Sequence, residues 1–126
     1  MSETVLLVDD SGLARRGTRR ILEGSGYRVI EAEDGLAALE RYALERPDVV
    51  LLDLVMRGMY GLDVLTKLRE MDPAARVIVI SADIQTSSRE LVRNAGASGF
   101  LTKPVDAEQL LGAVGRALAG ESDRWS

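Results

Sequence analysis

Short runs of apolar residues alternate along this chain with longer segments in which apolar residues recur at helical spacing. The short runs are rich in valine, isoleucine and leucine, which favours buried strands of a parallel sheet. The longer segments carry apolar residues three or four positions apart, as is typical of helices with one buried face. The alternation predicts five strand–helix units in a single α/β domain.

The bounds of these elements follow from the apolar spacing and from the residues that interrupt it. Segment 27–32 alternates polar and apolar residues, so we expect a half-buried strand at an edge of the sheet. The helix near 84–95 begins with several polar residues, which predicts a mobile first turn. We expect strands over about 4–9, 27–32, 48–53, 76–81 and 98–102, and helices over about 12–24, 35–45, 61–71, 84–95 and 107–119.

Helix ends and buried faces can be predicted in the same way. Gly24 and Gly26 mark a stop for the first helix. Asp106 is the expected N-cap of the last helix, with Gln109 completing a capping box. The residues expected on buried helix faces are Ala14, Thr18, Ile21 and Leu22; Leu36, Leu39 and Ala43; Leu65, Leu68 and Met71; and Ala107, Leu110, Leu111, Val114 and Leu118.

Strands that alternate with helices form a parallel sheet with helices on both faces. We expect a doubly wound sheet of five strands in the order 2-1-3-4-5, with five helices. Such sheets bind ligands at the carboxyl ends of their strands, close to the point where the strand order reverses. That point lies between the first and third strands, so the residues that follow those strands are the first candidates for a site.

Polar side chains stand at the ends of four of the expected strands. These are Asp9 and Asp10 after the first strand, Asp53 at the end of the third, Ser81 at the end of the fourth and Lys103 after the fifth. Adjacent carboxylates stay ionised together only if a cation offsets their repulsion. Mg²⁺ prefers carboxylate, water and phosphate oxygens. The combination therefore suits a Mg²⁺ ion and a phosphoryl group.

Each of these residues also has a purely structural interpretation. An acidic pair before a helix is often a turn or an N-cap, and Asp53 alone could end a strand at a turn. A single serine is more often a turn residue, and a single lysine is usually solvated. The residues occur together and in order, however, and three acids, Lys103 and one Mg²⁺ sum to zero charge. The pattern as a whole favours a site in which Asp53 is a nucleophile toward phosphorus.

Composition narrows the class of protein further. A chain of 126 residues is long enough for one domain with a stable core, and no apolar run is long enough to span a membrane. The net charge is −4 and basic residues are interleaved with acids, so we expect no nucleic-acid surface. The lack of histidine excludes a Ser-His-Asp triad and a histidine metal site. The lack of cysteine and of a signal peptide fits a cytoplasmic protein.

These motifs together resemble the receiver domain of two-component response regulators, over residues 4–119. The resemblance is to single-domain receivers of the chemotaxis-regulator kind and implies a flavodoxin-like fold. The matching segments are Val8-Asp9-Asp10, Leu52-Asp53-Leu54-Val55-Met56 with Met59 and Gly61, Ser81-Ala82, and Gly99-Phe100-Leu101-Thr102-Lys103-Pro104.

The resemblance implies a role for each of the acidic residues. Asp53 is implied to be the phosphorylated residue. Asp9, Asp10, Asp53 and the backbone carbonyl of Val55 are implied to bind Mg²⁺.

The resemblance also implies roles for residues of the later strands. Ser81 and Lys103 are implied to contact the phosphoryl group and to act in catalysis with Asp53. Ser81 and Phe100 are implied to be switch residues, although Phe100 lacks the hydroxyl of a tyrosine. The Lys103–Pro104 bond is implied to be cis.

The implied function is signalling activated by phosphorylation. A sensor histidine kinase or a phosphotransfer protein would phosphorylate Asp53, and the surface of the fourth helix, fifth strand and fifth helix would change to control binding of a downstream protein target. Any enzymatic activity would be limited to the protein's own phosphorylation and dephosphorylation. We expect a monomer or a weak phosphorylation-dependent dimer, with residues 1–119 as the receiver and 120–126 as a polar tail outside the core.

Two alternatives stay open. The chain could be a receiver fragment of a larger regulator, but we favour a stand-alone response regulator because the chain starts at Met1 and ends without a long linker. A phosphatase of the haloacid dehalogenase type would also use an aspartate nucleophile and Mg²⁺. That class carries a second acid two residues after the nucleophile, where this chain has Val55, and the length leaves no room for a cap domain.

Overall fold

The computed structural model describes residues 2–56, 58–82 and 86–121. Within them, each strand and helix lies inside the range that the sequence predicts for it. The strands are β1 (Thr4–Val8), β2 (Arg28–Ala32), β3 (Val49–Asp53), β4 (Val77–Ser81) and β5 (Gly99–Thr102). The helices are α1 (Gly12–Gly24), α2 (Gly35–Glu45), α3 (Gly61–Met71), α4 (Thr86–Asn94) and α5 (Ala107–Leu118).

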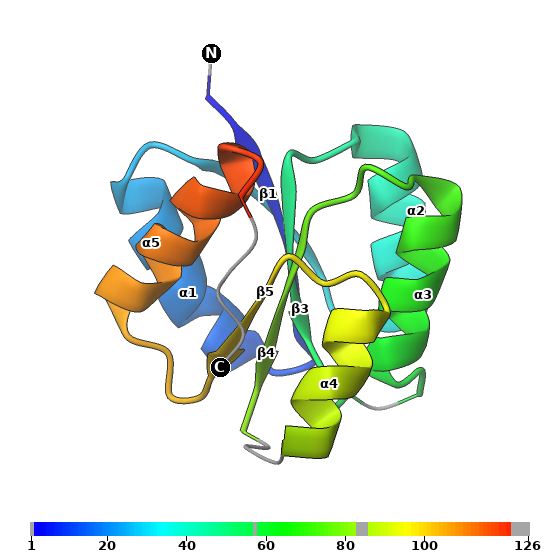
Figure 1. Ribbon diagram of the computed structural model, residues 1–126. Helices are drawn as coiled ribbons and strands as arrows, with labels where there is room; N and C mark the ends of the chain where they lie inside the picture. Colours follow the sequence, from blue (N-terminus) through cyan, green and yellow to red (C-terminus); the bar gives the residue numbers. More distant parts are fainter. Residues whose placement is uncertain (1, 57, 83–85, 122–126) are drawn as a thin grey trace.

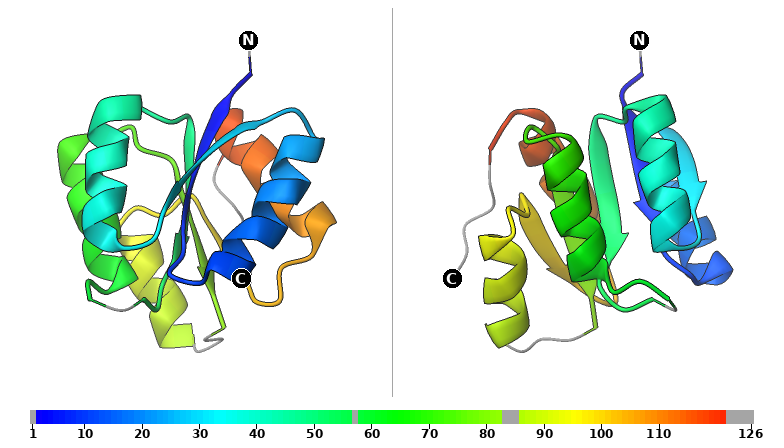
Figure 2. Two further views of the ribbon diagram at one scale, coloured as in Figure 1. Left: turned by 180° about the vertical axis from the view of Figure 1, so that it is seen from behind. Right: turned by 90° about the vertical axis from the view of Figure 1, so that its right-hand side faces the viewer.

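The strands form one parallel sheet in the order β2-β1-β3-β4-β5, which confirms the predicted flavodoxin-like topology. Helices α1 and α5 cover one face, and α2, α3 and α4 cover the other (Figures 1 and 2). The strand order reverses between β1 and β3, where this class of sheet binds its ligands. β2 lies at an edge and is partly exposed, as predicted.

The sheet separates two apolar layers, because successive side chains of a strand point to opposite faces. Leu6 of β1 packs in the layer under α2 and α3, and the next residue, Leu7, packs in the layer under α1 and α5. Every residue of β3 and β4 is buried. The central strands therefore carry the polar residues that end them, Asp53 and Ser81, into surroundings with little water.

Polar side chains fix the starts of three helices. Ser11, Asp34 and Asp106 precede α1, α2 and α5, and each side chain accepts a hydrogen bond from the backbone N–H three residues later. The bond at Asp106 confirms the predicted N-cap of the last helix. α1 ends at Gly24, and the chain then turns at Gly26 with a φ of 92°, as the predicted stop requires.

The buried faces of the helices agree with the prediction only in part. Residues buried as predicted are Leu22, Leu65, Leu68, Leu110 and Val114. Half-buried are Ala14, Thr18, Ile21, Leu39, Leu111 and Leu118. The prediction is wrong for Leu36, Ala43, Met71 and Ala107, whose side chains are exposed. Apolar spacing identifies a helix, but it does not distinguish between neighbouring apolar stripes on that helix.

Helix α2 shows the physical reason. It buries Ala38 and Tyr42, while Leu36 is 65% exposed. At its first residue, Gly35, an added Cβ would lie only 2.8 Å from Cγ2 of Val64 in α3. The first turn of α2 therefore packs closely against α3 through Gly35, and the next residue, Leu36, lies on the exposed side of the helix.

Two predictions fall largely outside the described residues. The mobile first turn of the helix at 84–95 includes residues 84 and 85, and the polar tail consists mostly of residues 122–126 with Trp125. Both stay predictions. Among the residues that the structure describes, no helix is both long and apolar enough to cross a membrane.

One hydrogen bond joins the inner side of α2 to the end of α3. The Tyr42 hydroxyl, on a side chain that is almost fully buried, donates to Oδ2 of Asp72 at 2.7 Å. This bond is the largest cause of the lowered pKa of Asp72, and a hydrogen bond from the backbone N–H of Ala74 is the second. Folding therefore stabilises the ionised form of Asp72.

We predict that Tyr42→Phe lowers the free energy of unfolding by about 1 kcal/mol at neutral pH, because a hydrogen bond to a partly exposed carboxylate is lost. The folded-state pKa of Asp72 is depressed, so its contribution is present above the unfolded pKa of about 3.9 and is lost as pH falls through the folded value. Urea unfolding of both proteins measures this, and the difference between them should shrink as the pH is lowered below about 4. Equal stability at neutral pH would contradict the prediction.

Candidate functional site

Three carboxylates meet at the carboxyl ends of β1 and β3. Asp9 and Asp10 follow β1, and Asp53 is the last residue of the neighbouring β3. One carboxylate oxygen from each residue lies within 4.8 Å of the others. Asp9 and Asp53 are only 6% and 7% exposed, and Asp10 is half-buried. The fold thus brings together the three acids that the sequence places at this edge.

The ammonium of Lys103 lies between two of these carboxylates. Its Nζ atom is 3.1 Å from Oδ2 of Asp9 and 3.2 Å from Oδ2 of Asp53. Lys103 follows β5 directly, and its backbone N–H donates to the carbonyl oxygen of Ser81 at the end of β4. The bond between Lys103 and Pro104 is cis, as predicted. Two strands therefore hold Lys103 beside the acids.

Burial and neighbouring charges shift the pKa values of Asp53 and Lys103 at this site. Burial raises the pKa of Asp53, the Lys103 charge lowers it and the Asp9 charge raises it again, with a net upward shift. Burial lowers the pKa of Lys103, but the charges of Asp53 and Asp9 outweigh burial, and the net shift is also upward. Burial is the largest cause of the raised pKa of Asp53, and the charge of Asp9 adds to it. A bound cation would offset the mutual repulsion of the carboxylates.

The donor set fits a Mg²⁺ ion. Mg²⁺ binds hard oxygen ligands, usually one or two carboxylates together with waters and phosphate oxygens. Three carboxylate oxygens close enough to share one ion meet that requirement. Val55 lies beside them, since its backbone N–H donates to Oδ1 of Asp53 at 3.3 Å. Its carbonyl as a metal ligand stays a prediction.

Ser81 and Phe100 lie on the next two strands of the sheet. Ser81 is fully buried at the end of β4, and the register pairs Asp53 with the residue before it, Ile80. Phe100 is half-buried in β5, and the guanidinium of Arg89 in α4 lies 5.5 Å from the centre of its ring. The serine is thus close in register to Asp53, and the aromatic ring links β5 to α4.

A hollow of about 600 Å³ opens beside the carboxylates. Its lining includes Asp53, Lys103, the small residue Ala82 and apolar side chains of α1 such as Leu13. Asp53 is therefore shielded from most of the solvent but borders an open space. A phosphoryl donor could approach the carboxylate from this side.

Two further residues shape the site in ways that sequence reasoning misses. Gly61 belongs to the motif around Asp53, but its purpose becomes visible only in the fold: an added Cβ would lie 2.6 Å from the Asp53 carbonyl oxygen and from Cα of Leu54. Arg15 of α1 donates to the main-chain carbonyl oxygen of Asp9. The motif signals the glycine, whereas no pattern in the chain singles out the arginine.

A doubly wound sheet with three acids, a serine and a lysine at the carboxyl ends of its strands defines the class of receiver proteins. The sequence model of the family described as "Response regulator receiver domain" matches residues 5–115, and the chain belongs to this family.

Individual relatives agree with this assignment. The chain is 36% identical to the chemotaxis protein CheY of Bacillus subtilis over 119 residues, which are 94% of this chain and 99% of that protein. It is 40% identical over 111 residues to the response regulator MprA of Mycobacterium ulcerans, which are 88% of this chain but only 48% of that protein. The solved CheX-CheY-BeF3-Mg complex from Borrelia burgdorferi matches with a TM-score of 0.86 and 34% identity, over 89% of this chain and 86% of that one.

Membership of this family carries a general function. The protein is a CheY-like receiver, and phosphorylation-activated signalling is what such domains perform. Receivers interact with histidine kinases or phosphotransfer proteins and with downstream targets, and they generally bind Mg²⁺ at an acidic site. The cluster of Asp9, Asp10 and Asp53 is an acidic site of this kind.

We predict that Gly61→Ala destabilises the protein by about 1–3 kcal/mol, because the new methyl group forces the loop after β3 away from Asp53. Gly115→Ala is the matched control, since a Cβ at this position in α5 meets nothing within 4 Å. It should stabilise the protein by about 0.5–1 kcal/mol through helix propensity. Urea unfolding compares the two, and equal effects would show that close packing at Gly61 is unimportant.

Proposed function

We propose that this protein is a response regulator that accepts a phosphoryl group on Asp53, and that this modification switches a surface for protein binding. The observation that carries the proposal is the setting of Asp53: a buried carboxylate 3.2 Å from the Lys103 ammonium, beside two further acids and bordering an open hollow. Such a site supports transfer of a group that is rich in negative charge.

In the proposed reaction, a carboxylate oxygen of Asp53 attacks the phosphorus of the donor. The bond from phosphorus to the donor's leaving atom breaks, and an acyl phosphate forms on Asp53. Lys103 pairs with one of the new phosphoryl oxygens, and the Ser81 hydroxyl donates to another. Positioning and charge neutralisation supply most of the catalysis, since little proton transfer is needed.

Asp9, Asp10, Asp53 and the backbone carbonyl of Val55 are the proposed Mg²⁺ ligands. When bound, Mg²⁺ supplies positive charge against the phosphoryl oxygens. The charges of the three acids, Lys103 and Mg²⁺ then sum to zero. The incoming phosphoryl group then adds negative charge to this balanced set, and its neighbours respond to that charge.

The proposed switch starts from this new charge. The phosphoryl group draws the Ser81 hydroxyl toward it, and the vacated space lets Phe100 turn inward. Phe100 contacts Arg89 of α4, so its movement changes the surface formed by α4, β5 and α5. A local charge thereby biases an element with two states.

The proposed partners are a sensor histidine kinase or a phosphotransfer protein as donor, and a downstream protein target. We propose residues 1–119 as the receiver unit and a stand-alone regulator as the form of the protein, which the nearly full-length match to B. subtilis CheY supports. A receiver within a larger regulator is the alternative, and the match to about half of MprA supports it. The stop codon of the encoding gene decides between the two.

We predict that incubation with acetyl phosphate and Mg²⁺ adds the mass of one phosphoryl group to the protein and that Asp53→Asn abolishes this gain, because an amide cannot replace the carboxylate nucleophile. Asp63→Asn is the matched control, since Asp63 is exposed in the first turn of α3 and should leave labelling unchanged. Mass spectrometry of the intact proteins measures the gain. Equal labelling of wild type and Asp53→Asn would refute Asp53 as the acceptor.

We predict that Ser81→Ala retains phosphorylation on Asp53 at a reduced rate but loses the response of α4, β5 and α5, because the hydroxyl that follows the phosphoryl group is missing. Amide resonances recorded with and without beryllofluoride and Mg²⁺ report this response. Wild type should show changes near Phe100 and along α5, and the variant should show changes only near Asp53. Full changes along α5 in the variant would rule out Ser81 as the link.

A further inference from the structure

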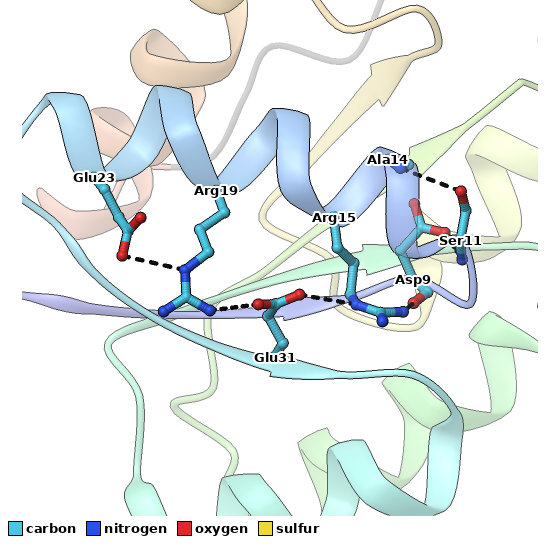
Figure 3. A network of polar contacts seen from close by, with 7 residues as sticks. All are labelled: Asp9, Ser11, Ala14, Arg15, Arg19, Glu23 and Glu31. Atoms are coloured by element: carbon cyan, nitrogen blue, oxygen red, sulfur yellow. Dashed lines mark hydrogen bonds and ion pairs between the residues drawn. The ribbon is translucent and has the colours of Figure 1, made fainter.

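A series of ion pairs along α1 leads from the surface to the acidic site (Figure 3). Arg19 pairs with Glu23 one turn further on, at 3.1 Å, and also with Glu31 of β2. The other carboxylate oxygen of Glu31 accepts a hydrogen bond from Nε of Arg15 at 2.9 Å. Arg15 then donates through Nη1 to the main-chain carbonyl oxygen of Asp9. The network therefore ends on a residue of the candidate metal site.

The contact with Arg15 completes the fixation of Asp9. β1 ends one residue earlier, so the Asp9 carbonyl lies beyond the strand ladder. The Asp9 N–H donates to the carbonyl oxygen of Ala32 at 3.2 Å, and Oδ1 accepts from the backbone N–H of Ser11 at 2.9 Å. Oδ2 lies 3.1 Å from the Lys103 ammonium. With the bond from Arg15, every polar atom of Asp9 has a partner.

Arginine is suited to this position because its guanidinium donates in two directions at once. Arg15 is 17% exposed, and its two donors reach Glu31 on β2 and Asp9 after β1. Burial raises the pKa of Glu31, but hydrogen bonds from Arg19 and Arg15 outweigh burial and keep the pKa below its usual value. Glu31 is therefore an ionised anchor that holds the Arg15 side chain in place.

We propose that Arg15 is a positioning residue of the acidic site, which holds the main chain of Asp9 so that its carboxylate is correctly oriented for a divalent cation. This inference rests on the proposed function, in which Asp9 binds Mg²⁺. Arg15 contacts the backbone oxygen of Asp9, so it does not compete with the cation for the carboxylate. Removal of a group that orients a metal ligand typically weakens metal binding by about 10- to 100-fold.

The charge of Arg15 and its positioning role act in opposite directions. Arg15 is a cation close to a cation site, so a role through charge alone predicts that its removal tightens Mg²⁺ binding. The positioning role predicts that its removal weakens binding, because the orientation of Asp9 is no longer fixed. The sign of the change therefore distinguishes the two.

The test compares Mg²⁺ affinity in wild type, Arg15→Gln and Arg19→Gln, followed by amide resonances during titration with MgCl₂ at constant ionic strength. Both variants lose one positive charge from α1 and one ion pair with Glu31, but only Arg15 reaches Asp9. We expect about tenfold weaker binding for Arg15→Gln. For Arg19→Gln we expect a Mg²⁺ affinity within about twofold of wild type. Arg19 is more exposed than Arg15 and lies further from the acidic site, so water and salt screen its charge there.

Thermal unfolding with and without Mg²⁺ provides a second readout. If Arg15 only stabilises the fold, its substitution lowers the unfolding temperature equally with and without Mg²⁺. If Arg15 positions Asp9, the substitution also reduces the rise in unfolding temperature that Mg²⁺ produces. If Arg15→Gln fails to fold, Arg15→Lys replaces it, since lysine keeps the charge but lacks the two-directional guanidinium. Arg15→Lys should bind Mg²⁺ at least about threefold more weakly than wild type.

The possible results distinguish failure of the positioning role from failure of the proposed metal site. Unchanged or tighter Mg²⁺ binding by Arg15→Gln, or equal losses in both glutamine variants, overturns the positioning role while the proposed function stands. Wild-type affinity of Arg15→Lys also overturns it. A wild-type protein that binds no Mg²⁺ overturns the metal site of the proposed function, and the inference that depends on it falls with it.

Discussion

The contact of one ammonium with two carboxylates is the constraint on which the site depends. Lys103 follows β5, Asp9 follows β1 and Asp53 ends β3, so the contact exists only when strands from both halves of the chain occupy one sheet. Burying any of these charges alone would be costly, and mutual pairing offsets much of that cost. A third acid, Asp10, lies beside this pair and adds negative charge to the cluster. In the proposed function, this cluster binds a divalent cation and Asp53 then accepts a phosphoryl group.

The surrounding fold keeps this charged cluster in place. β3 and β4 are buried along their whole length, so the residues at their ends have little freedom to move away. Gly61 lets the loop after β3 return against the backbone of Asp53, and Arg15 ties the backbone of Asp9 to β2. Rigid strands and specific backbone contacts thus position the reacting groups, which is how sites gain precision without extra contacts to the ligand.

The proposed switch requires the opposite property, freedom to move, in the adjoining strands. Ser81 ends β4, where its carbonyl oxygen accepts a hydrogen bond from the N–H of Lys103. Phe100 lies on β5, where its ring contacts Arg89 of α4. In the proposed switch, a displacement that starts at Asp53 passes to the surface over these two neighbouring strands.

The elements, their order and the acids at the strand ends could be predicted from the sequence, because apolar periodicity, helix caps and strand termini are local properties of the chain. Which apolar residues of a helix are buried could not, as exposed Leu36 and Met71 show, because burial depends on what packs against the helix. The functions of Gly61 and Arg15 likewise appear only in three dimensions. Lys103 and Asp9 are 94 residues apart in the chain, and their contact is a property of the assembled sheet. The sequence by itself determined the secondary structure and the chemical groups available, whereas the tertiary structure alone decided which groups touch and which faces are hidden from water.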